Sequence, residues 1–141
     1  MPVLSVTRLH VRSWRHVPVV LLATLRSAHQ ARRAEGNLAV AVLGDVKNTF
    51  WARSAWQNED AMRAYIWSGV HRRIMSNLST WCDEAAVAHW EAEKPEIQSW
   101  EEAHHYLQRY GREPVIDPSK HGTLAHAPPP RVRGWAHLRL K

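Results

Sequence analysis

Residues 37–57, NLAVAVLGDVKNTFWARSAWQ, decide the fold. The first nine, residues 37–45, are apolar on both faces and predict a strand. A short turn at residues 46–48 leads into a second predicted strand, residues 49–57, whose side chains alternate between two faces. One face of that strand carries Phe50, Ala52, Ser54 and Trp56, and the other carries Trp51, Arg53 and Ala55. The segment therefore predicts two neighbouring strands with side chains to bury on both sides of a sheet.

A strand and a helix precede this segment. Residues 3–11, VLSVTRLHV, are rich in β-branched residues and predict a strand. Pro18 fits the first turn of a helix, and Arg32 and Arg33 complement the dipole at the other end of that helix. Gly36 suits the position just after a helix. A β-α unit thus leads into the two central strands.

A helix and a strand follow it. Asn58 is a candidate N-cap, and the acidic residues 59 and 60 lie where the helix dipole favours anions. The helix pauses at Gly69 and resumes as HRRIMSNL over residues 71–78. Residues 85–91, AAVAHWE, predict a fourth strand. This part of the chain supplies a second α-β unit.

The C-terminal part adds a helix and a tail. Ser99 and Glu102 form a capping box that begins a final helix, and Gly111 suits its end. Residues 114–141 are basic and rich in proline, which predicts an extended tail with one short strand within residues 131–140.

The order β-α-β-β-α-β predicts an α+β fold of the ferredoxin-like class: an antiparallel four-stranded sheet with two helices on one face. Here an extra C-terminal helix and tail follow it. The other face of the sheet must be covered, and a second copy of the chain would cover it. We therefore predict a domain over residues 1–113, a tail over residues 114–141, and a homodimer joined through the sheets as a dimeric α/β barrel.

Composition excludes several classes of protein. With 141 residues, 45% of them hydrophobic and 23% charged, the chain matches neither collagen, nor a coiled coil, nor a wholly disordered protein. Its single cysteine, Cys82, cannot form an internal disulfide, and we interpret it as a buried structural thiol. Residues 1–36 carry a net charge of +5, residues 37–113 carry −3, and residues 114–141 carry +4. Because the basic residues are dispersed and match no reader motif, we expect no nucleic-acid partner.

The N-terminal segment only loosely resembles a signal peptide. Three arginines precede the apolar stretch between Val17 and Leu25, but Arg26 ends this stretch after nine residues. A membrane-spanning helix needs about 20 residues. We interpret the segment as part of the fold and expect a cytoplasmic protein without a membrane partner.

The candidate site centres on His71. His71, Ile74, Met75 and Leu78 recur at helical spacing, which places an imidazole on an apolar stripe that should face the sheet. Three interpretations stay open: a core residue, an axial haem ligand, or a base beside a ligand cavity. The familiar nucleotide, metalloprotease and hydrolase motifs are absent from the sequence.

Arg53 is the second candidate, because an arginine in an apolar strand needs an anion or an aromatic face. It either forms an ion pair or binds a substrate carboxylate or haem propionate. We predict His71 and Arg53 as the catalytic residues. The predicted pocket lies between the sheet and the second helix, and its walls are Trp51, Trp56, Tyr65, Met75 and His89.

Residues 48–90 carry a resemblance to a known family. The run NTFWARSAWQNEDAMRAYIWSGVHRRIM, followed by WCDEAAVAHW, is similar to small bacterial proteins related to the antibiotic-biosynthesis monooxygenases and, more distantly, to spheroidene monooxygenase. The resemblance implies a dimeric α/β barrel with one pocket per subunit. It does not fix the reaction, since spheroidene monooxygenase is a haem protein, whereas the antibiotic-biosynthesis enzymes oxidise aromatic polyketides without metal or flavin.

Two function classes follow. The first is a small monooxygenase-like enzyme acting on a hydrophobic molecule, in which His71 either ligates haem or removes a proton so that the carbanion reacts with oxygen. The second is a non-catalytic protein that binds a small molecule or haem in the same pocket. We favour the enzyme, with haem or no cofactor, because the family resemblance points to it.

Overall fold

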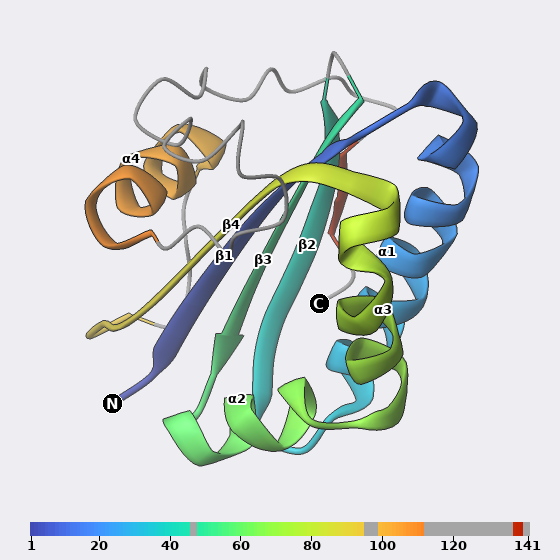
Figure 1. Ribbon diagram of the computed structural model, residues 1–141. Helices are drawn as coiled ribbons and strands as arrows, with labels where there is room; N and C mark the ends of the chain where they lie inside the picture. The colour runs from blue at the N-terminus through green and yellow to red at the C-terminus, as the bar shows by residue number, and fades with distance from the viewer. Residues whose placement is uncertain (46–47, 95–98, 112–136, 140–141) are drawn as a thin grey trace.

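A twisted antiparallel sheet separates two unequal helical layers (Figure 1). The computed structural model describes residues 1–45, 48–94, 99–111 and 137–139. In chain order the elements are β1 (Val3–Val11), η1 (Trp14–His16), α1 (Val17–Arg33), β2 (Asn37–Asp45), β3 (Thr49–Trp56), α2 (Glu59–Ile66), α3 (Gly69–Trp81), β4 (Cys82–Glu91), α4 (Trp100–Tyr110) and β5 (His137–Arg139). The strands lie in the order β4-β1-β3-β2-β5. The predicted α+β ferredoxin-like fold with an extra C-terminal helix is therefore confirmed.

The sequence signals for the helix ends operate as expected. The Asn58 side chain accepts a hydrogen bond of 2.9 Å from the Ala61 amide, and the Ser99 hydroxyl accepts one of 3.0 Å from the Glu102 amide. The helical segment is interrupted between α2 and α3, as predicted at Gly69. Gly36 has φ +84°, and a Cβ there would lie 2.6 Å from the Cβ of Ala61. Glycine at this position lets the turn after α1 approach α2 closely.

The fourth strand begins three residues earlier than predicted. β4 starts at Cys82, which pairs with Val11 after a register shift that follows His10. The two acidic residues after Cys82 hid this start, because strands seldom contain such residues. The Asp83 carboxylate lies 2.6 Å from His10 Nδ1, so it is accommodated there by a local partner.

A short strand from the C-terminal segment completes the sheet. β5 pairs antiparallel with β2, with Val42 opposite Leu138. This agrees with the strand expected within residues 131–140, of which residues 131–136 and 140 lie outside the described residues. The boundary between a domain and a tail at residue 113 stays a prediction.

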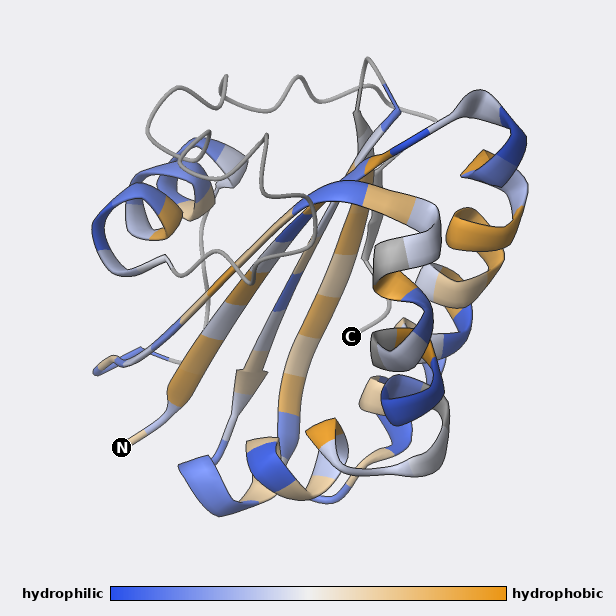
Figure 2. Cartoon of the chain, in the orientation of Figure 1, coloured by the Kyte–Doolittle hydropathy of each residue, from blue (hydrophilic) through white to orange (hydrophobic). Residues whose placement is uncertain are grey.

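Helices α1, α2 and α3 cover one side of the sheet, here called the three-helix face (Figure 1). Figure 2 shows β1 and β2 mainly in the hydrophobic colours, as expected for strands whose side chains are buried in a core. The core on this side is formed by Val3, Ala28, Ala31, Val40, Val42, Trp56 and Met62. The two α1 residues in this core, Ala28 and Ala31, have small side chains, so α1 packs closely against β2.

Helix α4 covers the opposite side, here called the α4 face (Figure 1). Trp100, Ala103 and Leu107 pack against strand residues Leu4, Val6, Ala41, Leu43, Trp51, Ala55, Ala86 and Ala88. The homodimer was predicted because this face needed a cover, and α4 of the same chain supplies one over the central strands. The homodimer itself stays a prediction.

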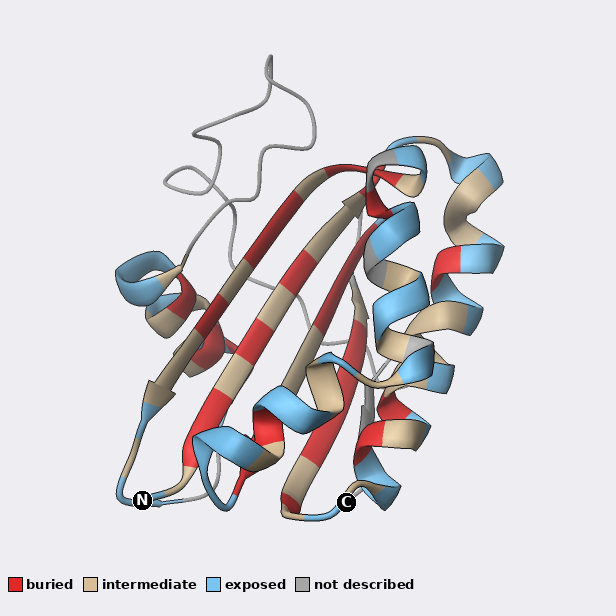
Figure 3. Cartoon of the chain, turned by 60° about the horizontal axis from the view of Figure 1, so that its bottom comes forward, coloured by how far each residue is buried: buried red, intermediate tan, exposed pale blue. Residues whose placement is uncertain are grey.

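The two faces are buried to different degrees. Along β1, residues 4, 6 and 8 are buried on the α4 face, whereas residues 5, 7 and 9 on the three-helix face are only partly buried. Figure 3 shows this alternation of buried and intermediate residues along the strands. Partial burial beneath a layer of helices indicates that these helices stand away from the middle of the sheet.

The docking of α4 gives a direct test of the fold. Leu107 is fully buried against the sheet, so Leu107→Ala should lower the free energy of unfolding by about 2–5 kcal/mol. The neighbouring exposed substitution Gln108→Ala should change it by less than about 0.5 kcal/mol. Urea denaturation of both variants measures the difference, and equal stabilities would show that α4 does not pack on the sheet.

Candidate functional site

A cavity of about 300 Å³ lies between the three-helix face and its helices. This volume is at the lower end of the range typical of small-molecule pockets, about 300–1,000 Å³. Its walls come from β1, β2, β3 and β4 and from α1, α2 and α3, and include Ser5, Thr7, Leu9, Val20, Thr24, Ser27, Ala52, Ser54, Trp56, Tyr65, His71, Ile74, Leu78, Trp81, Val87 and His89. Small side chains on β3 and β4, chiefly alanine and serine, leave this space open.

Three rings form a row along one wall of the cavity. The rings of Trp56 and Tyr65 stack, with centroids 5.0 Å apart and planes 25° apart, and the Tyr65 and His71 rings are also 5.0 Å apart. Trp56 Nε1 donates a 2.9 Å hydrogen bond to the Ser54 hydroxyl. Tyr65 bonds both the hydroxyl and the carbonyl of Ser27 on α1. These contacts fix the orientation of the rings, so the wall is built before any ligand binds.

The break between α2 and α3 places His71. The imidazole lies in the first turn of α3, and its Nδ1 is 3.2 Å from the carbonyl oxygen of Ile66 in α2. A carbonyl oxygen only accepts hydrogen bonds, so Nδ1 must be the protonated nitrogen. Nε2 then carries the lone pair of the neutral ring. The backbone of one helix thereby selects the tautomer of a side chain on the next.

Burial keeps this histidine neutral. Desolvation lowers the pKa of His71 below its ordinary value of 6.5, and the hydrogen bond to Ile66 partly offsets the effect. At pH 7 the ring is therefore an uncharged base or ligand on an apolar wall. By contrast, burial raises the pKa of Tyr65, so its phenol stays protonated.

The structure separates the predicted site residues into two groups. Trp56, Tyr65, His71 and His89 all line the cavity. Trp51 lies on the α4 face, fully buried in the other core. Arg53 points to the same face, and its guanidinium carbon lies 4.7 Å from the centre of the Trp100 ring. Arg53 is also among the residues that line the cavity, although its guanidinium lies on the other face. The prediction of one pocket walled by all these side chains is therefore wrong. Because side chains alternate along β3, those of Trp51 and Arg53 point to one face of the sheet and that of Trp56 to the other.

The residues of the cavity do not fit haem. The predicted partner of a haem propionate was Arg53, which stacks on α4 instead. Among the described residues that line the cavity, no other lysine or arginine is present. A propionate there would lack a cationic partner, and burying an unpaired carboxylate is costly. We derive no step through haem.

Met75 and Cys82 are the two remaining residues that the sequence singled out. The side chain of Met75 lies outside the described residues, so its place in the pocket stays a prediction. Cys82 is buried, and desolvation, helped by the neighbouring charge of Asp83, raises its pKa to about 11. A protonated thiol is a poor nucleophile, which agrees with the structural role predicted for it.

The hydroxyl groups that line the cavity were not predicted from the sequence. Ser5 and Thr7 on β1 and Ser27 on α1 all line the cavity. A signal for the first two was present: they alternate with Leu4, Val6 and Arg8, so they share the opposite face of the strand. For Ser27 no such signal existed, because its bond to Tyr65 joins residues 38 positions apart.

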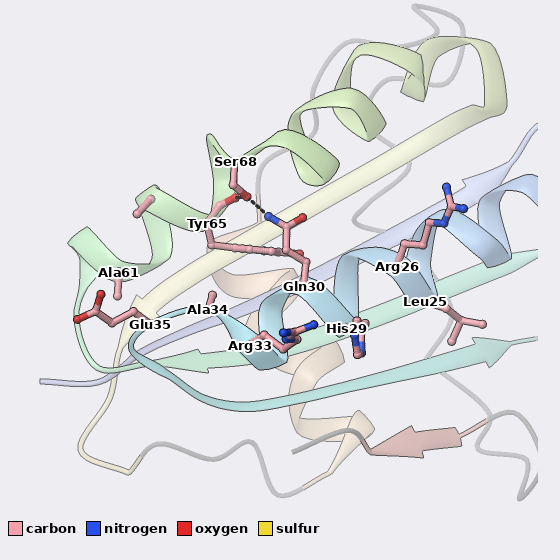
Figure 4. A pocket seen from close by; sticks show the side chains of 11 residues that line it. Leu25, Arg26, His29, Gln30, Arg33, Ala34, Glu35, Ala61, Tyr65 and Ser68 are labelled. Carbon is pink, nitrogen blue, oxygen red and sulfur yellow. Dashed lines mark hydrogen bonds between the residues drawn. The ribbon is translucent and has the colours of Figure 1, made fainter.

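A second, more open hollow of about 810 Å³ lies between α1 and α2 (Figure 4). Leu25, Arg26, His29, Gln30, Arg33, Ala34, Glu35, Ala61, Ala64, Tyr65 and Ser68 line it. The Gln30 side chain bonds the Ser68 hydroxyl across this groove, as the dashed line in Figure 4 marks. Tyr65 borders both spaces. The groove is a surface feature, whereas the smaller cavity contains the neutral histidine.

Solved structures show what this fold is similar to. No protein-family model matches the sequence, and no curated protein is significantly similar to it. A point mutant of SnoaB, a cofactor-independent oxygenase from Streptomyces nogalater, is 17% identical over 70% of this chain and 98% of its own, with a TM-score of 0.57. An antibiotic biosynthesis monooxygenase is 14% identical over 65% and 99%, with a TM-score of 0.58. PA3566 from Pseudomonas aeruginosa is 10% identical over 66% and 95%, with a TM-score of 0.59.

These comparisons confirm the predicted resemblance at the level of the fold. The chain has the fold of these structures, which include SnoaB and an antibiotic biosynthesis monooxygenase. Each of these neighbours is matched over nearly its whole length, while about a third of this chain lies outside the match. The similarity therefore concerns the fold, and the residues of the cavity carry the information about function.

The histidine gives a pH-dependent prediction. The pKa of His71 is lower in the folded than in the unfolded chain, so the unfolded chain binds more protons and stability falls as pH drops below about 6.5. His71→Gln removes this contribution. The stability of the natural protein relative to His71→Gln should therefore decrease between about pH 7 and pH 5, as measured by urea denaturation.

The exposed histidine His105 on α4 supplies the control, because His105→Gln removes a titratable side chain far from the cavity. A difference between the natural protein and His71→Gln that stays constant or grows as pH falls would contradict the burial of a neutral imidazole.

Proposed function

We propose that the protein is a small oxygenase-like enzyme that binds a hydrophobic molecule in the cavity between the sheet and its helices, and that His71 is the base. The observation that carries the proposal is the state of His71: neutral, partly desolvated, and held by Ile66 in the tautomer whose Nε2 has the lone pair. A base of this kind accepts a proton from a weakly acidic group at neutral pH.

The walls favour a flat, apolar substrate. The stacked rings of Trp56 and Tyr65 offer a rigid aromatic surface beside His71. The substrate would lose a proton to Nε2, and the resulting carbanion would react with dioxygen without a cofactor. A neighbour in fold, SnoaB, is described as a cofactor-independent oxygenase, and this supports the choice of chemistry.

The alternative is a binding protein that uses the same cavity. One observation favours it: three of the cavity hydroxyls already have partners, because Ser54 bonds Trp56 and the hydroxyls of Ser27 and Tyr65 bond each other. Groups engaged in this way are not prepared to stabilise the charge that develops in a reaction. Catalysis would then depend on His71 and on the other hydroxyl residues of the cavity, Ser5, Thr7 and Thr24.

Anthrone tests the proposal, because it is flat and apolar and loses a proton to give an aromatic anion. One anthrone and one dioxygen would give one anthraquinone and one water. We expect oxygen consumption by the natural protein, and His71→Gln should reduce the rate by about 10²–10⁴-fold. The control His105→Gln should retain the full rate.

Two results would decide against the enzyme. Equal rates for His71→Gln and the natural protein would remove His71 as the base. Anthrone that quenches the tryptophan fluorescence but is not oxidised would favour the binding protein. A Soret band in the purified protein that His71→Gln abolishes would restore the haem hypothesis.

A further inference from the structure

Helix α1 is apolar on two opposite faces. Its inner face packs on the sheet through Val20, Ala28 and Ala31. On the outer face, positions 18, 21, 22 and 29 recur at helical spacing, and the first three are the exposed residues Pro18, Leu21 and Leu22. A surface helix normally has polar residues on that side. The outer side of α1 therefore needs an explanation that the fold does not give.

The exposed apolar side chains gather at one end of this helix. Among the residues whose side chains the structure describes, seven large apolar residues are exposed, and four of them lie within residues 14–22. These four, which we call the α1 patch, are Trp14 (73% exposed), Val19 (38%), Leu21 (44%) and Leu22 (50%). Figure 2 shows the first half of α1 mainly in hydrophobic colours and its second half mainly in hydrophilic ones. Single exposed apolar residues are common, but a cluster marks an interaction site.

The charge around the patch is of one sign. Residues 1–34 contain six arginines and no acidic residue, since Glu35 is the first. Arg15, which follows Trp14 within the patch, and Arg26, four residues after Leu22, are both exposed, and the Arg15 guanidinium carbon lies 6.0 Å from the centre of the Trp14 ring. Further along the same face, His29 and Arg33 line the open groove of Figure 4. The apolar patch thus has a cationic border.

We propose that this surface docks on an anionic lipid bilayer. Exposed leucines on a helix and a tryptophan just before it, together with arginine, resemble the composition of helices that lie in the membrane interface. A second copy of the chain fits less well, because a two-fold axis through the patch would bring Arg15 and Arg26 of one copy near arginines of the other. The helices in the described ranges are too short or too polar to cross a membrane. The proposal concerns docking on the surface, and it replaces the expectation of no membrane partner, which considered spanning alone.

Vesicle co-sedimentation tests this directly. The natural protein should bind vesicles of equal parts phosphatidylcholine and phosphatidylglycerol, bind phosphatidylcholine alone weakly, and dissociate as salt is raised. Leu21→Ser/Leu22→Ser should lower the partition coefficient roughly 10-fold or more. Both positions are exposed, so the fold should persist, and a thermal melt checks this.

A pair of charge variants provides the matched comparison. Arg15→Gln/Arg26→Gln should weaken binding roughly 10-fold or more. Arg72→Gln/Arg73→Gln removes the same charge from exposed positions on α3 and should leave binding within about 2-fold. Equal losses in the two variants would show binding by net charge alone and would overturn the proposal. So would the absence of vesicle binding, including the case in which light scattering finds a dimer that Leu21→Ser/Leu22→Ser dissociates.

Discussion

The alternation of side chains along β3 is the constraint on which the rest of the structure depends. Trp51 and Trp56 are both fully buried, and because they lie five positions apart in the strand their side chains point to opposite faces of the sheet. One indole must enter the α4 core and the other the three-helix core. The sheet consequently needs a cover on both sides, which α4 supplies on one and α1, α2 and α3 supply on the other.

The two covers differ in closeness, and the cavity follows from that difference. Helix α4 packs directly on the strands through Trp100, Ala103 and Leu107. On the other side α1 packs closely on β2, while the space over β1, β3 and β4 is bounded by Tyr65 and His71 from the break between α2 and α3. The same break provides the carbonyl of Ile66 that fixes the imidazole tautomer. Fold and chemistry are therefore linked through a single interruption in a helix.

Most of the fold could be predicted from the sequence, because its signals are local. Caps at Asn58 and Ser99 and the apolar strands fixed the elements within a few residues, apart from the start of β4. The site was predicted only in part, because a site depends on which face each side chain takes. His71 and Trp56 both line the cavity, whereas the guanidinium of Arg53 lies on the α4 face, as the alternation along β3 requires. The cover by α4 could not be foreseen, since a helix pattern does not say which face of a sheet the helix will meet.

The state of the His71 ring is the centre of this account, because a base needs a neutral imidazole with a lone pair on Nε2. Long-range ¹H–¹⁵N NMR correlation of the histidine side chains, assigned with His71→Gln, measures both the tautomer and the pKa. We predict an Nδ1-protonated ring whose pKa lies below 6.5. A ring protonated on Nε2 at neutral pH, or a pKa above 6.5, would contradict the account.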